Sequence, residues 1–491
     1  MLTLESPADV LQYDGPAPVV LRVPGRPGGT CLIQAIGVNY PCNFSDPDRV
    51  SVDLPSAALE SAGDLSLVLV DGAGAELTTS VVLPVRPSPA RRTWYHPALD
   101  YAGADPLYIY FANPHRQAST ITVTYFTGAA LPVTRNVSLG AQQVTRFELG
   151  GPLGPGTTGP MAARVDATVP IGTTVSRFVG SLSTGDNVAG VTQPRQQWFL
   201  LAGATSVDRT LFLANPGAVP ADVTYTEYVG PASNPQTVTL SPQRAMTLAR
   251  GTSGSLEPTA WQVDATAPIL AAAASQNGVG LTILDARPAP ALDAYFPIAA
   301  TGDGAEDWVV LFNPGLQLVP LELTAFRAGG ADAAIPLQVG AGKVTAFHVT
   351  EATSSAGPFF LHVSTTAPLV TGYARVSSSV EGCGLASTSP ARDLLFSAGA
   401  NTGVSTRLFV GNPSAVEASV VVTAYREGST APVTGTRTFP AGSPGWILGN
   451  GDPVNWPNGA MAVRLSASVP VVAGLDRVNP SGVRCEAPAL P

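Results

Sequence analysis

The chain has 491 residues and a formal net charge of −9; 45% of its residues are hydrophobic and only 12% are charged. This balance excludes a disordered polyelectrolyte, and 26 Lys plus Arg without basic runs offer no docking surface for nucleic acid. With 50 Gly, 46 Pro and no collagen triplet, the sequence is typical of short strands joined by many turns, and its length predicts several domains.

The beginning of the chain and its apolar stretches bear on where the protein resides. Its uncharged apolar stretches fall far short of the ~18 residues that a membrane-spanning helix needs, so we expect no membrane span. The first residues, MLTLESPADV, lack the charged and apolar regions of a signal peptide. If the protein is exported, either its leader has been removed or it leaves its cell by another route.

Residues 1–90 are predicted to form a separate β-sandwich. Segments with period-two alternation, such as PVVLRVPG, RVSVDLPSAAL and LSLVLVDGAG, are broken by Gly, Pro and Asp about every ten residues. Their order, with SPADV near the start and DGAG near the end, resembles the TIG (IPT) domains of bacterial surface proteins. That resemblance implies an immunoglobulin-like sandwich.

The rest of the chain repeats itself four times. Asn215 lies 102 residues after its counterpart in the first copy, and the following intervals are 98 and 99 residues. We expect β-sandwich repeats at 91–195, 196–292, 293–391 and 392–491. The shared Asn-Pro motif consists of Asn113-Pro114, Asn215-Pro216, Asn313-Pro314 and Asn412-Pro413.

Each repeat follows the same order of predicted strands. It opens on a large apolar pair: Trp94-Tyr95, Trp198-Phe199, Tyr295-Phe296 or Leu395-Phe396. The Asn-Pro ends the next strand, because Pro lacks an amide hydrogen and favours extended geometry in the preceding Asn. An alternating strand follows, and we expect its aromatic residue to close the core: Tyr125, Tyr228, Phe326 or Tyr425. A last strand contains the repeated prolines Pro170, Pro268, Pro368 and Pro470.

These strands predict an all-β protein of tandem immunoglobulin-like antiparallel β-sandwiches in an elongated array. The aromatic start, LFLANPG, the alternating strand and the final VPVVA segment resemble immunoglobulin-like repeats of unknown function in exported proteins of high-GC actinobacteria and Chloroflexi. The resemblance covers residues 93–485. It implies exported, surface or wall-associated structural roles and no activity, and the fourth copy departs from it at Leu395 and in a loop around Trp456.

Catalytic residues are not apparent. The four histidines, His96, His115, His348 and His362, lack ligand-spaced partners, and hydrolase, metalloprotease, phosphate-loop and dinucleotide motifs do not occur. Asp166 and Asp264 become Ser in the other two repeats, which favours a turn or edge position over an acid or base. We therefore expect no enzyme activity and no cofactor.

Three acidic loops are candidate calcium sites: Asp46–Asp48, Asp303–Asp307 and Asn450–Asp452. Calcium prefers several convergent oxygens, but no EF-hand or nonapeptide spacing is present. Solvated turns explain these loops better, and we expect no metal. A calcium titration that left the melting temperature unchanged would exclude one.

The cysteines suggest two different roles. Cys31 and Cys42 lie eleven residues apart in one small sandwich, so we expect a disulfide between them. Cys383 and Cys485 lie at equivalent positions of neighbouring repeats, which are a whole domain apart in a straight array. Either the repeats fold back so that these cysteines meet, or they are free thiols or join separate molecules; we favour the second.

Repetition without a catalytic constellation favours a non-enzymatic extracellular structural protein, a stalk or a fibre or filament subunit. Expected partners are further copies of the chain or other surface or virion proteins. The alternatives are an adhesin or carbohydrate-binding surface protein, with Trp94, Trp198, Trp446 or Trp456 on a glycan, and a virion tail-fibre or decoration protein. Specific function is expected where the copies disagree, at 428–434, 449–459, the N-terminal module and the two equivalent cysteines.

Overall fold

The computed structural model describes most of the chain between residues 2 and 488, and it is all-β, as the sequence predicts. Its description omits residues 8, 47, 61, 72 and 79 and the segments 13–14, 24–30, 100–106, 129–130, 149–158, 180–183, 203–207, 230–231, 251–257, 278–279, 286–288, 299–305, 350–358, 377–380, 386–388, 401–404, 449–458 and 479–483. Within the described residues the strands pair almost entirely antiparallel, and the short 3-10 helix η1 (Ser56–Leu59) follows β6.

The N-terminal domain is a β-sandwich with the strand order β1-β3-β6-β5-β4-β7-β8-β2. The long strand β5 belongs to both layers, because its first residues pair with β4 and its last residues pair with β6. The strands are β1 (Thr3–Ser6), β2 (Val10–Leu11), β3 (Ala17–Arg22), β4 (Leu32–Ala35), β5 (Val38–Asp46), β6 (Arg49–Leu54), β7 (Gly63–Val70) and β8 (Val81–Arg86).

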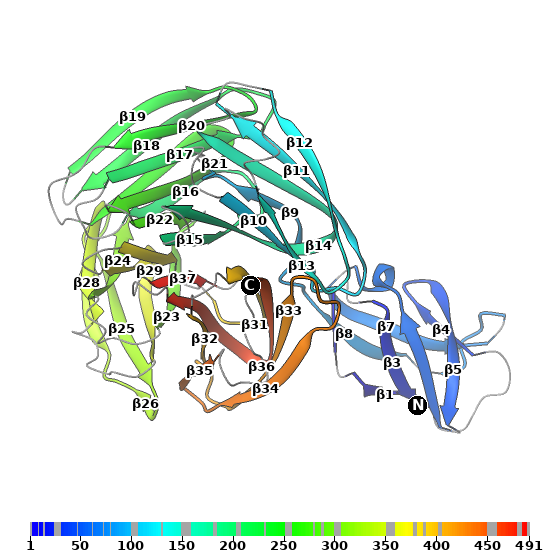
Figure 1. Cartoon of the computed structure of the whole chain (residues 1–491). Helices are drawn as coiled ribbons and strands as arrows, with labels where there is room; N and C mark the ends of the chain where they lie inside the picture. Colours follow the sequence, from blue (N-terminus) through cyan, green and yellow to red (C-terminus); the bar gives the residue numbers. More distant parts are fainter. Residues whose placement is uncertain are drawn as a thin grey trace.

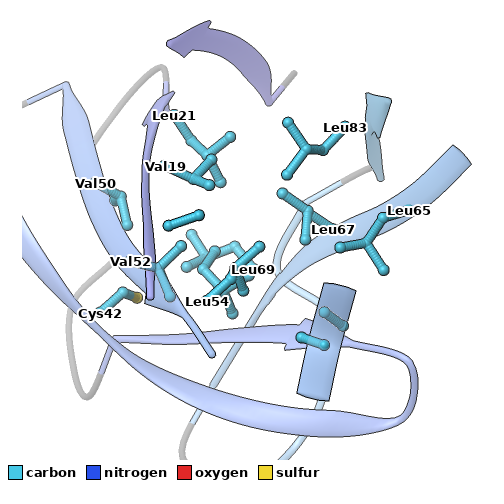
Figure 2. Packing of buried hydrophobic residues seen from close by; sticks show 14 of the residues in the cluster. Val19, Leu21, Cys42, Val50, Val52, Leu54, Leu65, Leu67, Leu69 and Leu83 are labelled. Atoms are coloured by element: carbon cyan, nitrogen blue, oxygen red, sulfur yellow. The ribbon is translucent and has the colours of Figure 1, made fainter. Parts of the chain in front are cut away.

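Alternate residues of these strands point inward and form the core of this domain. Val19, Val52 and Leu67 come from three different strands and are at most 2% exposed (Figure 2). At one side of this core Cys31 and Cys42 form a disulfide, with their Cα atoms 5.1 Å apart. The bridge that the spacing predicts therefore joins the start of β4 to β5.

Each of the four repeats contains the same set of strands. Repeat 1 comprises β9 (Arg91–His96), β10 (Leu107–Ala112), β11 (Ser119–Thr127), β12 (Val133–Leu139), β13 (Val144–Glu148), β14 (Met161–Val179) and β15 (Thr184–Ala189). Repeat 2 comprises β16 (Arg195–Ala202), β17 (Asp208–Asn215), β18 (Ala221–Val229), β19 (Ala232–Leu240), β20 (Arg244–Arg250), β21 (Thr259–Asn277) and β22 (Gly280–Asp285).

Repeats 3 and 4 follow the same order, with one additional short strand, β26, in repeat 3. Repeat 3 comprises β23 (Ala291–Ile298), β24 (Glu306–Asn313), β25 (Val319–Arg327), β26 (Gly330–Ala331), β27 (Ile335–Val339), β28 (Lys343–His348), β29 (Phe359–Val376) and β30 (Glu381–Leu385). Repeat 4 comprises β31 (Ala391–Ala400), β32 (Ser405–Gly411), β33 (Ala418–Arg426), β34 (Val433–Phe439), β35 (Pro444–Leu448), β36 (Gly459–Val478) and β37 (Arg484–Pro488).

One long strand in each repeat connects the two layers of the sandwich. In repeat 1 the first half of β14 pairs with β11 and β9, and its second half pairs with β10 and β15. Pro170 lies between the residues paired with β11, which end at Ala167, and those paired with β10, which begin at Gly172. Because Pro has no amide hydrogen to donate, it suits the point where the strand leaves one sheet for the other. Pro268, Pro368 and Pro470 occupy the same place.

Some strands of the repeats, such as β10, are buried on both faces. In β10, Ile109 and Phe111 belong to the core of repeat 1, whereas Tyr110 and Ala112 pack against repeat 4. Side chains alternate across a strand, so one set faces the interior of its own sandwich and the other set faces a neighbouring repeat. This arrangement explains the uninterrupted apolar run LYIYFA, since a strand covered on both faces does not need polar positions.

The outer face of one sheet in each repeat packs on the outer face of a sheet in the next, and the fourth repeat packs back on the first. The mixed apolar clusters are Phe126 and Ala162 with Ala214 and Leu270, Phe199 and Leu201 with Val310 and Phe312, Phe360 with Phe409 and Val472, and Leu395 and Tyr425 with Tyr110 and Ala112. The four sandwiches thus form a closed ring, with the N-terminal domain beside it (Figure 1).

The last strands of the repeats meet at the centre of this ring. β15 contacts β22, β22 contacts β30, β30 contacts β37, and β37 contacts β15. The expected elongated array is therefore wrong, although the all-β class is confirmed. One sheet of each repeat packs on the other sheet of the next repeat, which is a head-to-tail contact. Because each such contact turns the next repeat by about a quarter of a circle, four copies close into a ring and do not extend into a row.

Candidate functional site: the ring-closing seam

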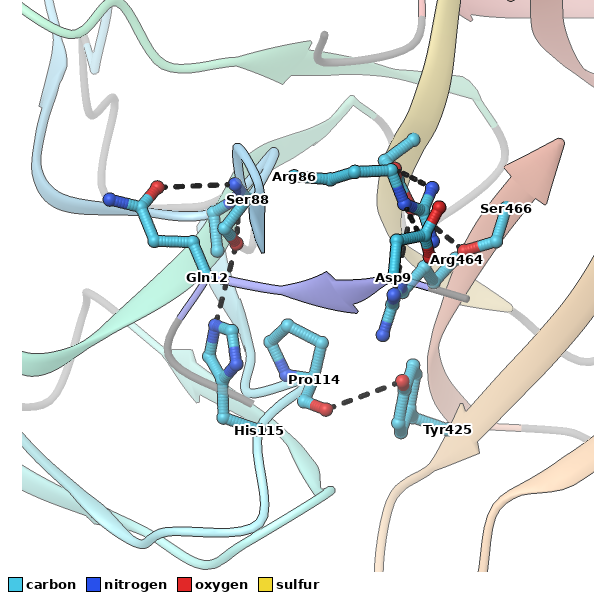
Figure 3. Close-up of polar contacts among 11 residues, drawn as sticks. Asp9, Gln12, Arg86, Ser88, Pro114, His115, Tyr425, Arg464 and Ser466 are labelled. Atoms are coloured by element: carbon cyan, nitrogen blue, oxygen red, sulfur yellow. Dashed lines mark hydrogen bonds and ion pairs between the residues drawn. The ribbon is translucent and has the colours of Figure 1, made fainter. Parts of the chain in front are cut away.

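The seam between repeats 4 and 1 is where segments distant in the chain bring charged groups together. Arg86, at the end of β8, forms an ion pair with Asp393 of β31 and a second one with Asp9, at 3.0 Å. Ser466 donates a hydrogen bond of 2.7 Å to Asp393, and Arg464 lies 3.5 Å from the same carboxylate (Figure 3). The Asp393 side chain is only 5% exposed, with Arg86 of the N-terminal domain and two residues of its own repeat beside it.

The carboxylate that Arg86 binds has a counterpart in every repeat. Asp393 pairs across the strands with Ser466, and Asp293 pairs with Ser364; in repeats 1 and 2 the pairs are Thr93 with Asp166 and Gln197 with Asp264. The carboxylate therefore changes strand between the first two and the last two repeats. In repeats 3 and 4 the long strand has Ser in place of Asp166, and the opening strand supplies the Asp instead.

A donor accompanies this carboxylate in each repeat, two residues before the cross-strand position on the long strand. Arg164 lies 2.8 Å from Asp166, Gln262 donates to Asp264 at 2.8 Å, and His362 lies 2.8 Å from Asp293. In repeat 4 Arg464 and Asp393 form the corresponding pair. The interpretation of Asp166 and Asp264 as edge positions misses this role, because the compensating residues lie roughly seventy positions away.

Uncharged contacts extend the seam. The hydroxyl of Tyr425 donates to the carbonyl of Pro114 at 3.4 Å, and Ser88 Oγ lies 3.5 Å from His115 Nε2 (Figure 3). The backbone of Val144 in repeat 1 forms a parallel bridge with Glu427 of repeat 4, and Arg146 lies 3.7 Å from the Glu427 carboxylate. The Asn-Pro loop of repeat 1 is thus held between the N-terminal domain and repeat 4.

Two of the four histidines are buried and neutral. Burial lowers the pKa of His96 to about 3, and its Nε2 lies 3.0 Å from Thr173 Oγ1. Burial, and then the nearby Arg464 guanidinium, lower the pKa of His115 to about 3. His348 contacts Trp308 edge-on, and His362 stacks on Tyr295. The histidines therefore lie apart, in packing and hydrogen-bonding positions.

The repeated Asn is buried and holds its loop in place through side-chain hydrogen bonds. Asn215 is 0% exposed; its Nδ2 donates to the carbonyls of Val219 and Leu240, and its Oδ1 accepts from the amide of Gly217. The same three kinds of contact recur at Asn113, Asn313 and Asn412. The Asn side chain joins two adjacent loops by hydrogen bonds. Its role is therefore structural, and it goes beyond the extended backbone geometry that the following Pro predicts.

The opening tryptophans of repeats 1 and 2 lie in the cores of their own repeats. Trp94 and Trp198 donate through their indole N–H groups to the Ile171 and Ile269 carbonyls at 2.7 and 2.8 Å. They are 2% and 1% exposed and cannot stack on a glycan. Trp456 lies outside the described residues, and of Trp446 only the backbone is described.

The second repeated aromatic packs between repeats and does not close its own core. Tyr228, Phe326 and Tyr425 belong to the clusters that join their repeat to the next. In repeat 1 the residue equivalent to Tyr228 is Phe126, because Phe126 pairs with Ala162 just as Tyr228 pairs with Ala260. Tyr125 instead lies in the core of repeat 1. The expectation that Tyr228 closes a core is therefore wrong.

The acidic loops lie mostly outside the description. Asp303 and Asp452 are among the omitted residues, and Asp48 is exposed in a turn. Asp307 is 1% exposed and accepts a hydrogen bond from the hydroxyl of Tyr373 within repeat 3. Among the described residues, no cluster of three His, Cys, Asp or Glu side chains has the arrangement of a metal site. The described part also contains no helix with the length and apolarity that crossing a membrane requires.

The Asn-Pro loops of repeats 2, 3 and 4 each expose apolar side chains three to five residues after the Asn. Val219 is 59% exposed, Leu316 95%, Leu318 53% and Val416 57%. In repeat 1 the same loop carries His115, which is buried, and Arg116, whose guanidinium donates to the Pro16 carbonyl of the N-terminal domain at 3.2 Å. The Asn-Pro loop of repeat 1, which contacts the N-terminal domain, therefore has polar side chains where the loops of the other repeats expose apolar ones.

Comparison with known proteins finds a family model that matches less than half of the chain. The model of a family of unknown function (DUF5719) matches residues 284–487, which span repeats 3 and 4. No curated protein matches the chain. The immunoglobulin-like assignment and the actinobacterial or Chloroflexi source stay predictions.

Solved structures resemble the chain only weakly. Thermotoga maritima 1070 is 20% identical with a TM-score of 0.19, and the match covers 21% of this chain and 94% of that one. A Ca²⁺-stabilized adhesin that helps an Antarctic bacterium bind ice is 12% identical with a TM-score of 0.15, covering 79% and 97%. A carbohydrate-binding module of the β-sandwich superfamily is 10% identical with a TM-score of 0.14, covering 58% and 96%. Scores this low carry no argument about this chain.

Proposed function

We propose that this chain is a non-enzymatic, exported structural protein whose four repeats form a rigid ring that carries the N-terminal domain. The closed ring is the observation that supports this function. Every repeat packs part of each outer face against a neighbour, and Arg86 joins the N-terminal domain to Asp393 of repeat 4. The molecule is therefore built as a platform of fixed geometry.

A fibre formed through the repeat interfaces does not fit this arrangement. A head-to-tail contact extends into a filament only when its last copy leaves a face free, and here that face of repeat 4 packs on repeat 1. A stalk or filament would need other surfaces. We therefore assign the ring a scaffolding role, with partners bound on its periphery.

An exported location is part of the proposal. The Cys31–Cys42 disulfide supports it, because such bridges persist in oxidising compartments and are rare in the cytosol. The test is fractionation of the source cells with an antibody to the chain, with alkylation of free thiols before lysis. We expect the protein in the medium or envelope with both cysteines protected; a cytosolic protein with alkylated Cys31 and Cys42 would overturn the proposal.

Adhesion is a second candidate function, favoured by the exposed apolar loops. Leu316 and Leu318 extend from one loop of repeat 3 into solvent, and exposed apolar side chains on a rigid element are typical of binding surfaces. Binding to glycan and matrix-protein arrays should fall at least tenfold in Leu316→Ser/Leu318→Ser. Leu131→Ser is the matched control, since Leu131 is 78% exposed outside these loops. Equal binding by both variants would remove these loops from the function.

A further inference from the structure

The N-terminal domain docks where repeat 4 meets repeat 1 and contacts one position of each. Its Arg86 forms an ion pair with Asp393 on the opening strand of repeat 4, beside Arg464 (Figure 3). Its Pro16 carbonyl accepts a hydrogen bond of 3.2 Å from Arg116, three residues after the repeated Asn of repeat 1. Because the repeats pack head to tail, the same sheet and the same loop flank each of the other three junctions.

The carboxylate on this sheet has different partners in repeats 1 and 2. In repeat 1 Arg164 of the same strand neutralises Asp166, with its Nε 2.8 Å and its Nη2 2.9 Å from the two carboxylate oxygens. In repeat 2 Gln197 and Gln262 each donate an amide hydrogen bond of 2.8 Å to Asp264. Amide groups carry no net charge, so these contacts fix the position of the half-buried carboxylate and leave its negative charge for a further partner.

The loop position that Arg116 occupies in repeat 1 differs in the other repeats. It is Ala218 in repeat 2, Leu316 in repeat 3 and Ala415 in repeat 4. Leu316 is 95% exposed, and Leu318 of the same loop is 53% exposed. Removing such side chains from water is favourable. The loop of repeat 3 thus presents an apolar surface at the place where repeat 1 contacts the N-terminal domain.

A chain of contacts leads from Asp264 to this loop across the junction between repeats 2 and 3. Gln262, which donates to Asp264, accepts a hydrogen bond of 3.4 Å from the Tyr228 hydroxyl. The centroid of the Tyr228 ring lies 4.7 Å from that of Phe312, which directly precedes the repeated Asn of repeat 3. The carboxylate and the exposed leucines therefore lie on the two sides of one junction. We call this surface the 2–3 junction site: Gln197, Gln262, Asp264, Leu316 and Leu318.

We propose that the 2–3 junction site binds a separate protein that presents an arginine beside an apolar surface, as the N-terminal domain presents Arg86 at the ring-closing seam. A guanidinium group matches a carboxylate with two parallel hydrogen bonds, which a lysine does not reproduce. The exposed leucines need an apolar counterpart where the seam has the Pro16 carbonyl. A second copy of the chain does not supply this arginine from its N-terminal domain, because its own Asp393 binds Arg86.

This inference rests on the proposed scaffold and deepens it, because it names the chemistry of a partner on the periphery of the ring. It also agrees with the expectation that specific function lies where the copies disagree. Of Cys383 and Cys485, which the same expectation includes, only the backbone is described, so their pairing stays a prediction.

Selection of displayed peptides on the full chain tests the proposal. Random peptides on phage are selected on the immobilised wild type, with counter-selection on Asp264→Asn/Leu316→Ser to remove peptides that the net charge of −9 attracts. We expect the selected peptides to carry an arginine next to aliphatic or aromatic residues. Isothermal titration calorimetry with the synthetic peptides should show a roughly tenfold loss of affinity in Asp264→Asn and in Leu316→Ser, and when lysine replaces the arginine of the peptide.

Asp166→Asn is the matched control, because Asp166 occupies the position of Asp264 in repeat 1 and is already neutralised by Arg164. It should change the affinity less than about twofold, as should Leu131→Ser at a leucine of repeat 1 that is 78% exposed. An absence of enriched peptides, enriched peptides without arginine, or equal losses in Asp264→Asn and Asp166→Asn would each overturn the proposal. Such results leave the proposed scaffold and its export standing, whereas a cytosolic location would overturn the scaffold without changing these affinities.

Discussion

The interfaces between consecutive repeats differ from the one that closes the ring. Between repeats 2 and 3, Phe199 and Leu201 pack directly on Phe312 in an apolar cluster. The closing interface has its own apolar cluster around Leu395 and Tyr110, but it also carries the ion pair of Arg146 with Glu427, and beside it Arg86 of the N-terminal domain pairs with Asp393 of repeat 4. The same packing surface is used four times, and among the described residues the ion pair of Arg146 with Glu427 joins two repeats at the closing copy.

The difference follows from how the partners are connected. Consecutive repeats are joined by a short linker, so their high effective concentration favours packing without further contacts. Repeats 4 and 1 are held only by non-covalent contacts after about three hundred residues of intervening chain. Directional contacts between charged groups reject other registers, because a shifted docking would leave Asp393 buried without Arg86 of the N-terminal domain. The N-terminal domain thereby becomes part of the closure.

The largest expected effect comes from removing the seam carboxylate. Asp393→Ala leaves Arg86 and Arg464 facing each other under the N-terminal domain, and we expect the free energy of unfolding to fall by about 3–5 kcal/mol. Asp293→Ala is the matched control at the same place in repeat 3, where the carboxylate is 52% exposed; its cost should be about 0–1 kcal/mol. Chemical denaturation of both variants measures the difference, and equal losses would mean that the seam is an ordinary interface.

Two glycines allow apolar packing at the seam and at an inner interface to be compared. A Cβ on Gly172 would meet Leu395 of repeat 4 at 2.6 Å, and one on Gly372 would meet Leu201 of repeat 2 at 2.7 Å. Gly172→Ala and Gly372→Ala should each destabilise by about 1–3 kcal/mol through overpacking. Adding Leu395→Ala to Gly172→Ala should recover part of the loss in a double-mutant cycle. Additive losses would argue against direct contact across the seam.

The buried histidines predict a dependence of stability on pH. His96 within repeat 1 and His115 at the seam both have pKa values of about 3 when folded, below the 6.5 of an unfolded chain. Their neutral burial contributes fully above pH 6.5 and is lost as pH falls toward 3, because the unfolded chain then binds more protons. Between pH 8 and 5.5 each should account for about 1.4 kcal/mol. His115→Gln and His96→Gln should each flatten urea-unfolding stability curves over this range; unchanged slopes would contradict the assignment.

The smallest effect is expected at the edge of the seam. Glu427→Gln removes the ion pair with Arg146, whose side chain is 52% exposed at a separation of 3.7 Å. Solvent screening limits the expected loss to about 0.2–1 kcal/mol, and 1 M salt should remove it. Denaturation at low and high salt gives the comparison. A loss near that of Asp393→Ala would show that exposed charges, and not the buried carboxylate, hold the seam.

Local features of this fold follow from the sequence, whereas the ring does not. Alternation, turn residues and the spacing of Cys31 and Cys42 suffice for the strands and the disulfide, because these depend on neighbouring residues. The ring depends on the angle between packed sheets, which contacts such as Gly372 against Leu201 set across distant segments. The apolar run of residues 107–112 was the available signal, since a strand with one solvated face would alternate.

The candidate site was less accessible to prediction for a related reason. The carboxylate of Asp166 is replaced in repeat 4 by Asp393, which lies on a different strand, so comparing the copies position by position suggests a loss where there is compensation. Arg86 stands at the end of the N-terminal domain and reaches Asp393 only because the ring closes. A contact that forms only when the ring closes cannot be inferred from a sequence pattern that predicts separate β-sandwich domains.

Small-angle X-ray scattering of the purified chain tests the closed ring most directly. Scaling for a compact chain of this length gives a radius of gyration of roughly 23 Å, and the projecting N-terminal domain raises the expected value to about 25–30 Å. A row of five sandwiches, each about 30 Å long, would instead give about 45 Å and a maximum dimension near 150 Å. The closed ring predicts the smaller value in low and high salt; the larger one would contradict it.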